Sequence, residues 1–413
     1  MKKTSLLFLL SYFFLSVTHA QMDKQLLNFG QGANSKGKPS LAISGNKAYI
    51  LYTSANNMGK ICTYDLLTNE SEWSGELFPT IGATDASHNN AAMAIDGSGY
   101  IHVWIGMHNH RMKYWRSNSP RDIHNFTDCS AQMPWYDHSG IDEKRYTYPT
   151  TTTASNGDVF VILRRTALFM KGGVVREAEH DEKQDLYHWN NKKKTWTADL
   201  LLKQEGKNAY MSKLYADNKN NIHIVTAWSQ LHHGNNTYQR GTYLRYDNNI
   251  GSYSKADGKV VTIPAGVDIN PADVFFPGEK AWNDTICEIQ TPQVVVNGAG
   301  KPIITVPINT NFSPYKPKFE LNIIRFDGKI WVRQKNVLSD LKNYEHPPLA
   351  SSSKRVSIYA RNTSAYVLKS ADNGATFPTN EKLKSGGEPV DVINLDATTD
   401  IYITFSSLFK VVY

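Results

Sequence analysis

One local pattern returns seven times along this chain: a few apolar residues, a polar tight turn, and then an alternating apolar strand. Clear examples are MAIDGSGYIHVW (93–104) and LYADNKNNIHIVTAW (214–228). Asx-Gly-type turns between β-branched and aromatic runs are the strongest short-range signal of a β-hairpin. The seven turns are centred near residues 45, 97, 156, 218, 298, 353 and 397.

The spacing of these turns predicts the architecture. It averages about 60 residues, which suits a four-stranded propeller blade with its loops. Long helical periodicities are hard to find, and no linker-like composition divides the chain. A β-sandwich with ordinary hairpins is the alternative that the same turns allow. We predict an all-β fold, a seven-bladed β-propeller, as a single domain over residues 21–413.

A further motif favours the propeller. The stretch SADNGATF (370–377) has the S-x-D-x-G-x-T-aromatic form of an Asp-box, a hairpin turn typical of sialidase-like propellers. Ser370 and Asp372 are expected to cap backbone amides of the turn, and Gly374 to adopt a positive φ. The motif is structural and carries no information on catalysis.

The N-terminus predicts export. Residues 1–20, MKKTSLLFLLSYFFLSVTHA, combine a basic start, an apolar run and a small-x-small end, as in a signal peptide cleaved before Gln21. No later stretch approaches the roughly 20 apolar residues that span a bilayer. We therefore expect a soluble periplasmic or secreted monomer without a membrane or nucleic-acid partner. The net charge of +7 fits an acidic polysaccharide as the partner.

The metal-binding residue types form no clear pattern. Cys62, Cys129 and Cys287 are widely spaced and match no zinc-ribbon or redox motif, so we expect buried thiols without a disulfide. A structural metal ion stays open in two places. These are the H-x-H pair at residues 108 and 110, and a set formed by His223, His232, His233 and Cys287.

Hairpin register predicts which polar side chains meet at the central channel. Residues equidistant from a turn centre face each other across an antiparallel pair. His88 and His108 are centred on the second turn, and Tyr148 and Arg164 on the third. Tyr210 precedes the fourth turn by the same distance as Tyr148 precedes the third. We therefore predict that these five residues converge at one rim of three adjacent blades. A slip of one residue would exchange Arg164 for Arg165 as a substrate contact.

A His/Tyr/Arg group suits β-elimination on a uronic acid. In that reaction the C5 proton is removed and the C4 oxygen leaves. Arginine can neutralise the carboxylate, while histidine or tyrosine can transfer the protons. Tyrosine becomes a competent base only if a cation such as Arg164 lowers its pKa. Glycoside hydrolysis needs two carboxylates, and the nearest pair, Asp142 and Glu143, lies in the preceding loop. The elimination needs no cofactor.

The landmarks around these residues resemble a known family. They are His88-Asn89 followed by AAMAIDGSGYIHVWIGMHNH, Tyr148-Pro149 with Arg164, NAYMSKLYADNKNNIHIVTAW (208–228) and SKADGKVVTIP (254–264). Here the chain resembles the propeller-type polysaccharide lyases of families 24 and 25, the ulvan lyases, within a wider group of BNR-repeat proteins. The resemblance covers most of the mature chain. It implies that His88 and Tyr148 transfer protons, that Arg164 neutralises the uronate, and that His108 and Tyr210 contact substrate.

Two other functions stay open. The chain is also similar to propeller enzymes that act on rhamnose-capped glucuronate, some of them lyases and others rhamnosidases that use a lone histidine on the opposite face. No histidine lies in the first hairpin, residues 41–52, which disfavours a rhamnosidase. A non-catalytic carbohydrate-binding propeller would share the fold and the charge, but it would not need the set His88, Tyr148 and Arg164. The common substrate feature is rhamnose joined to C4 of a uronic acid.

Overall fold

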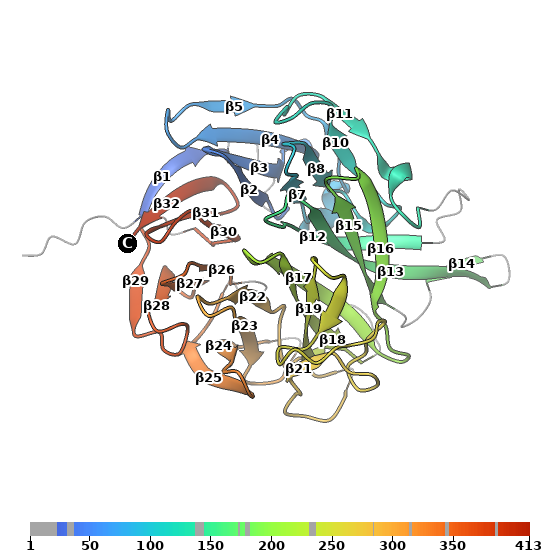
Figure 1. Cartoon of the computed structure of the whole chain (residues 1–413), viewed down its shortest axis with the longest axis vertical. Coiled ribbons are helices and arrows are strands. Elements are labelled where there is room, and N and C mark those ends of the chain that lie inside the picture. Colours follow the sequence, from blue (N-terminus) through green and yellow to red (C-terminus); the bar gives the residue numbers. More distant parts are fainter. Residues whose placement is uncertain are drawn as a thin grey trace, which may run out of the picture.

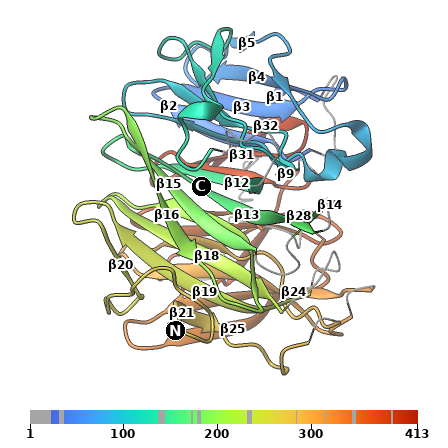
Figure 2. The ribbon, with the colours of Figure 1, turned by 90° about the vertical axis from the view of Figure 1, so that its right-hand side faces the viewer.

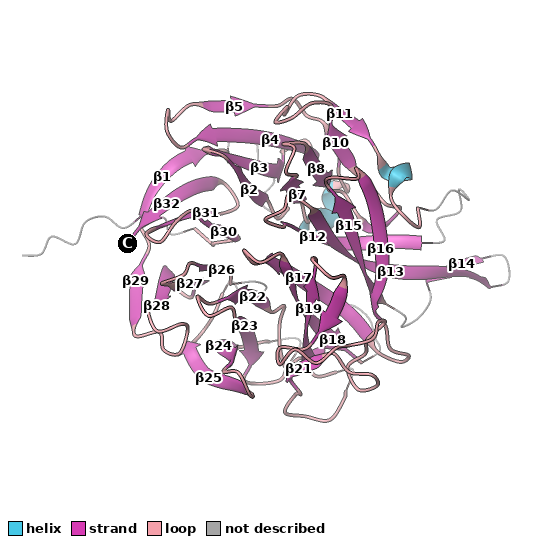
Figure 3. Cartoon of the chain, viewed as in Figure 1, coloured by secondary structure: helices cyan, strands magenta, loops and turns pink. Residues whose placement is uncertain are grey.

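The computed structural model describes residues 23–30, 37–136, 144–171, 174–177, 182–230, 237–283, 285–313, 316–342, 347–384 and 387–413. These residues form seven antiparallel sheets arranged around a central axis (Figure 1). Nearly all regular structure is strand (Figure 3), and the helices among these described residues are two short 3-10 turns, η1 (Ala83–His88) and η2 (Ser130–Gln132). The prediction of an all-β, seven-bladed propeller is confirmed. The predicted signal peptide, residues 1–20, lies outside the described residues.

The strands follow one another blade by blade, from the channel outward. Blade one contains β2 (Ser40–Ser44), β3 (Lys47–Thr53), β4 (Met58–Asp65), β5 (Ser71–Trp73) and β6 (Phe78–Pro79), and blade two contains β7 (Ala92–Ile95), β8 (Ile101–Trp104), β10 (Trp115–Ser117) and β11 (Phe126–Asp128). Blade three contains β12 (Lys144–Thr153), β13 (Val159–Lys171), β15 (Lys183–Asn190) and β16 (Thr195–Leu202). In the same blade, β9 (His108–His110) pairs with β12, and β14 (Val174–Glu177) pairs with β13. Figure 2 shows the ring from the side, with β9 next to β12.

The remaining four blades repeat the arrangement. Blade four contains β17 (Asn208–Ala216), β18 (Asn221–Ser229), β19 (Tyr238–Asp247), β20 (Ser252–Ser254) and β21 (Asp273–Phe276). Blade five contains β22 (Gln293–Val296), β23 (Pro302–Asn309), β24 (Phe319–Phe326) and β25 (Trp331–Leu338), and blade six contains β26 (Leu349–Ser351), β27 (Val356–Arg361), β28 (Ala365–Ser370) and β29 (Thr379–Lys382). Blade seven contains β30 (Asp391–Asn394), β31 (Thr399–Ile403), β32 (Ser407–Val412) and β1 (Asp23–Asn28).

The seven recurring turns all occupy the same position in their blades. Each joins the innermost strand of a blade to its second strand, as the hydrogen-bond register of every blade shows. The seven turns therefore share one face of the ring, and the innermost strands all begin at the opposite face. Any side chain near the start of an innermost strand is thus placed at that opposite mouth of the channel.

The ring is closed by joining the two ends of the described chain. Strand β1 pairs with β32, with Asp23 opposite Val411, so the last blade takes its outermost strand from the N-terminal side. Closure leaves each blade packed between two neighbours. Apolar side chains fill these inter-blade spaces; one cluster, for example, joins Phe160 and Ile162 of blade three to Ile222 and Ile224 of blade four.

The Asp-box forms the turn that the sequence predicts. The Ser370 hydroxyl donates to Asp372 Oδ1 (2.7 Å) and accepts the Gly374 N–H (2.8 Å), while Asp372 Oδ1 also accepts the Thr376 N–H (2.9 Å). Gly374 adopts a φ of 80°. The motif connects β28 to β29, so it stabilises an outer hairpin far along the chain from the His/Tyr/Arg group.

Two blades contain the same buried polar set. In blade two, the Tyr114 hydroxyl lies 2.7 Å from His102 Nδ1, and His102 Nε2 lies 3.5 Å from Asp96 Oδ2. In blade four, Tyr243, His223 and Asp217 repeat the arrangement, with distances of 2.7 and 3.2 Å. Burial lowers the pKa of His102 and of His223. The six-residue spacing of aspartate and histidine in both hairpins therefore encodes a structural contact rather than a site.

We expect the His102→Ala substitution to destabilise the protein by about 2–4 kcal/mol, because it leaves a cavity and removes a hydrogen-bond partner from the buried Tyr114 hydroxyl. The free energy of unfolding in urea measures the effect. His124→Ala is the matched control, since that side chain is 48% exposed and bonds only at the surface to Glu72. Equal losses in the two variants would contradict the structural role of His102.

Candidate active site

The five residues of the predicted group do come together, at the mouth of the channel opposite the seven turns. The ring centroids of His88 and His108 are 3.9 Å apart, and each lies close to the Tyr148 ring, at 6.2 and 6.0 Å. The rings of Tyr148 and Tyr210 are 6.0 Å apart. The Arg164 guanidinium contacts both tyrosine rings, at 4.7 and 4.3 Å from their centroids.

The local backbone differs from the predicted hairpin register. Arg164 pairs with Thr147 instead of Tyr148, because a β-bulge interrupts β12 between Thr147 and Thr150. Tyr148 lies in this bulge with a φ of 54°, and Pro149 has no N–H to donate to the ladder. Tyr210 occupies a corresponding bulge, between Ala209 and Met211 of β17. Both tyrosines therefore leave the regular pleat near the start of an innermost strand.

The two histidines also reach the site in an unexpected way. The paired part of the second hairpin starts at Ala92, so His88 is on no strand and instead ends the short helix η1. His108 begins β9, which pairs with β12 of the next blade. The predicted neighbours are correct although the predicted strand pairing is not.

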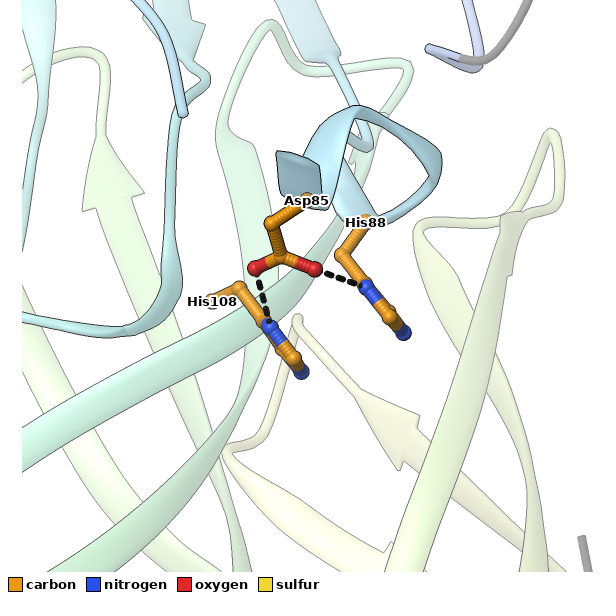
Figure 4. Close-up of side chains that lie close together, drawn as sticks. All are labelled: Asp85, His88 and His108. Atoms are coloured by element: carbon orange, nitrogen blue, oxygen red, sulfur yellow. Dashed lines mark hydrogen bonds and ion pairs between the residues drawn. The ribbon is translucent and has the colours of Figure 1, made fainter. Parts of the chain in front are cut away.

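An aspartate that the sequence reasoning missed joins the two histidines. Asp85 Oδ1 is hydrogen-bonded to His88 Nδ1, and Asp85 Oδ2 lies 2.7 Å from His108 Nδ1 (Figure 4). The imidazole rings are parallel within 5°. Burial alone would raise the pKa of Asp85, but the hydrogen bonds from His108 and His88 outweigh it and hold that pKa below its usual value. The only sequence signal was the three-residue spacing of Asp85 and His88.

Arg164 is enclosed rather than open to solvent. Its side chain is 2% exposed, and Nη1 lies 3.4 Å from a carboxylate oxygen of Glu182, a second residue absent from the prediction. Arg164 Nε and Nη1 make no hydrogen bond within the described part of the chain. The positive charge is therefore held directly against the two tyrosine rings, with hydrogen-bonding capacity left over.

This setting does not turn Tyr148 into a base. Burial raises the pKa of Tyr148 well above 10.0, as does the neighbouring Tyr210, and the opposing effect of Arg164 is smaller. Arg164 does lower this pKa, but not enough to offset burial and Tyr210. At neutral pH Tyr148 is a protonated hydroxyl, which is the form that can donate a proton.

Arg165 lies outside the group. It follows Arg164 on β13 and faces the other side of the sheet, where its guanidinium binds Asp185 through Nε and through Nη2 (3.0 Å) and stacks 5.4 Å from the Trp135 ring centroid. The alternative register, with Arg165 as the substrate contact, is therefore not the one adopted.

The metal alternatives find limited support. His110 is exposed, and its Nδ1 accepts the His108 N–H (3.2 Å). His223 belongs to the buried set of blade four, while residues 232 and 233 lie outside the described residues. Cys62, Cys129 and Cys287 are buried and unpaired. Among the described residues, the one cluster with ligand atoms close together is Asp85, His88 and His108.

The central channel of the ring contains open space. A cavity of about 720 Å³ follows the channel and is lined by the innermost strands of all seven blades. Asn90 and Pro149 belong to its lining, and they lie two residues after His88 and directly after Tyr148. None of the helices in the described part of the chain is long and apolar enough to cross a membrane.

Comparisons with known proteins agree on the fold. The model of a family described as "BNR repeat-containing family member" matches residues 47–334. A solved structure of a polysaccharide lyase 25 ulvan lyase superposes with a TM-score of 0.67 at 14% identity, covering 94% of this chain and 96% of that one. The same description with "-[GlcA(1-4)Rha3S]-" bound gives 0.66 at 14% identity over the same shares. The polysaccharide lyase Uly1 gives 0.67 at 14%, covering 90% and 89%. Among curated protein sequences, none matches significantly.

Proposed function

This chain belongs to the BNR repeat-containing family, and from that premise we propose that it is a polysaccharide lyase cleaving the bond between rhamnose and C4 of a uronic acid. The observation that carries the proposal is the group itself. A hydrogen-bonded Asp85–His88–His108 set faces a protonated Tyr148, and a buried arginine supports the tyrosine. The lyase described with bound "-[GlcA(1-4)Rha3S]-" shares this fold and favours the same substrate class.

The proposed reaction is a β-elimination in which each group has one task. His88 Nε2 takes the C5 proton, the C4–O4 bond breaks, and a double bond forms between C4 and C5. Tyr148 donates its hydroxyl proton to the departing glycosidic oxygen, which becomes the anomeric hydroxyl of the released rhamnose. Arg164, buried against the rings of Tyr148 and Tyr210, offsets the negative charge that develops on the uronate. His108 and Tyr210 contact the sugar.

Hydrolysis is less compatible with this group. A glycosidase needs one carboxylic acid and one carboxylate placed on either side of the bond. The two carboxylates here, Asp85 and Glu182, are each bonded to basic side chains, Asp85 to two histidines and Glu182 to Arg164. Asp85 is therefore held by hydrogen bonds and Glu182 by an ion pair, and neither is placed as an acid or a nucleophile.

The proposal is tested by incubating the purified protein with a glucuronate–rhamnose polysaccharide such as ulvan, and with rhamnose-capped arabinogalactan oligosaccharides. Shortening of the polymer together with ultraviolet absorbance of unsaturated uronate is the expected result. A neutral arabinan is the matched control and should remain intact. Binding without any cleavage would instead identify a carbohydrate-binding propeller. We also propose that the protein acts outside the cytoplasm, where such polysaccharides occur.

The pKa shifts predict a broad pH profile. Burial lowers the pKa of His108, the ring stacked on the proposed base His88, below its ordinary 6.5, so His108 should become charged and kcat/KM should fall only below about pH 6.5. The acid must be protonated, and burial raises the pKa of Tyr148 above 10.0, so the alkaline limb should lie above pH 10. Initial rates across this range measure both limbs. An alkaline limb between pH 7 and 9 would contradict Tyr148 as the acid.

A further inference from the structure

The Asp85 carboxylate contacts two imidazole rings, His88 and His108, and it contacts Nδ1 in each ring. Asp85 uses a separate oxygen for each ring, and both contacts are to Nδ1. An ionised carboxylate only accepts hydrogen bonds, so each Nδ1 must carry a hydrogen. A neutral imidazole has a single N–H, so Nε2 of both rings is then an unprotonated acceptor. Because the rings are stacked in parallel, the two Nε2 atoms point away from Asp85 in the same direction (Figure 4).

We propose that Asp85 is a positioning residue that fixes His88 and His108 in one tautomer, so that the two Nε2 atoms together form the proton-accepting surface of the site. The inference rests on the proposed function for its role in turnover, but the tautomers themselves do not depend on it. In the reaction, one Nε2 takes the C5 proton and becomes an imidazolium. The second ring stays neutral, because two stacked imidazolium ions at this spacing would repel each other.

The distances favour hydrogen bonds over a metal ion shared by these three residues. Two ligands bound 2.0–2.1 Å from a tetrahedral zinc lie roughly 3.3 Å apart. His108 Nδ1 is 2.7 Å from Asp85 Oδ2, and His88 Nδ1 is hydrogen-bonded to the other oxygen of Asp85. The three side chains would have to separate before an ion could enter between them.

A purely structural role is also a poor fit. The side chains of Asp85, His88 and His108 are 33%, 39% and 23% exposed. Contacts between partly exposed groups contribute little to folding. The orientation of the rings is therefore the property that the Asp85 carboxylate controls, and the test must read out that property directly.

The test compares Asp85→Asn with the unmodified protein, using side-chain nitrogen NMR of the histidines and steady-state kinetics. The asparagine amide has one accepting oxygen and one donating NH₂ group, so it can satisfy only one Nδ1–H. The other imidazole should move its hydrogen to Nε2. We expect His88 and His108 both to be protonated on Nδ1 in the unmodified protein, and one of them to change in the variant. We also expect kcat to fall on the order of 100-fold with KM changed less than threefold.

The controls separate this inference from the proposed function. Asp85→Glu keeps a carboxylate and should restore both tautomers and part of kcat, whereas Asp122→Asn, on a loop of blade two, should leave kcat unchanged. Hydrogen on Nε2 of either ring in the unmodified protein at neutral pH would overturn the inference, whether or not the protein is a lyase. An Asp85→Asn variant with unchanged kcat would also overturn it. So would a variant whose loss of kcat is fully explained by unfolding of the protein, as measured in urea. Absence of lyase activity would refute the proposed function, and the tautomers alone would then decide the inference.

Discussion

Replacing Tyr148 with phenylalanine should lower kcat by about two to four orders of magnitude, the range expected when a general acid is removed. The substitution deletes only the hydroxyl, so the ring can still pack against Arg164 and Tyr210. KM should change little, because the lost interaction is one that strengthens as the C4–O4 bond breaks. Initial rates followed by the absorbance of the unsaturated product give both constants.

A tyrosine elsewhere in the ring provides the control for this experiment. Tyr64 lies on β4 in blade one, where its hydroxyl donates to Asn69 (2.9 Å) in the turn that leads to β5. Tyr64→Phe should retain the kcat of the unmodified protein. If Tyr148→Phe also retains it, Tyr148 is not the proton donor, and the elimination would need a different acid.

Arg164→Ala is the second substitution with a large expected effect, and it should act on stability and on activity together. Removing the guanidinium leaves Glu182 without this partner and opens space beneath the two tyrosine rings, at a cost of about 2–4 kcal/mol. Under the proposed mechanism it also removes the positive charge that offsets the charge developing on the uronate, and a loss of roughly 100- to 1,000-fold in kcat is expected. Urea unfolding and initial rates on the folded protein measure the two effects separately.

Two further variants distinguish the effect of the lost charge on kcat from the effect of the substitution on stability. Arg355 in blade six resembles Arg164, since it is largely buried, pairs with Asp400 (2.7 Å) and stacks on Tyr413. Arg355→Ala should be destabilised to a similar degree yet keep its kcat. Arg164→Lys keeps the charge without the planar guanidinium, so it should recover part of the lost rate. The role assigned to Arg164 would be wrong if Arg164→Ala remained as active as Arg355→Ala.

The fold could be predicted from the chain because its signals are local. Each hairpin turn is encoded by a few residues such as DGSG or SNGD, and seven such turns at blade spacing suffice to indicate the architecture. Residues equidistant from a turn are then predicted to be neighbours in space, and this rule predicted the pairs His88 with His108 and Tyr148 with Arg164. The method works while both strands stay paired, because the period of a strand is regular.

The rest of the site depends on interactions that the positions of the turns do not predict. The bulge at Tyr148 and Pro149 shifts the register by one residue, and a bulge depends on packing as much as on the residues within it. Asp85 reaches the histidines from a 3-10 turn that no strand pattern describes. Glu182 approaches Arg164 from the start of another strand of the same blade. The pKa of Tyr148 follows from burial, which the sequence alone does not reveal.

The central claim is that the bond breaks by elimination, and the masses of the products test it most directly. A uronate–rhamnose oligosaccharide of defined length would be digested in ¹⁸O-labelled water, and all products would be weighed. Elimination predicts fragments whose masses sum to that of the substrate, one of them absorbing in the ultraviolet and none carrying ¹⁸O at the cleaved bond. Fragments that together gain one labelled water, with free rhamnose and no absorbance, would show hydrolysis and contradict the roles assigned to His88, Tyr148 and Arg164.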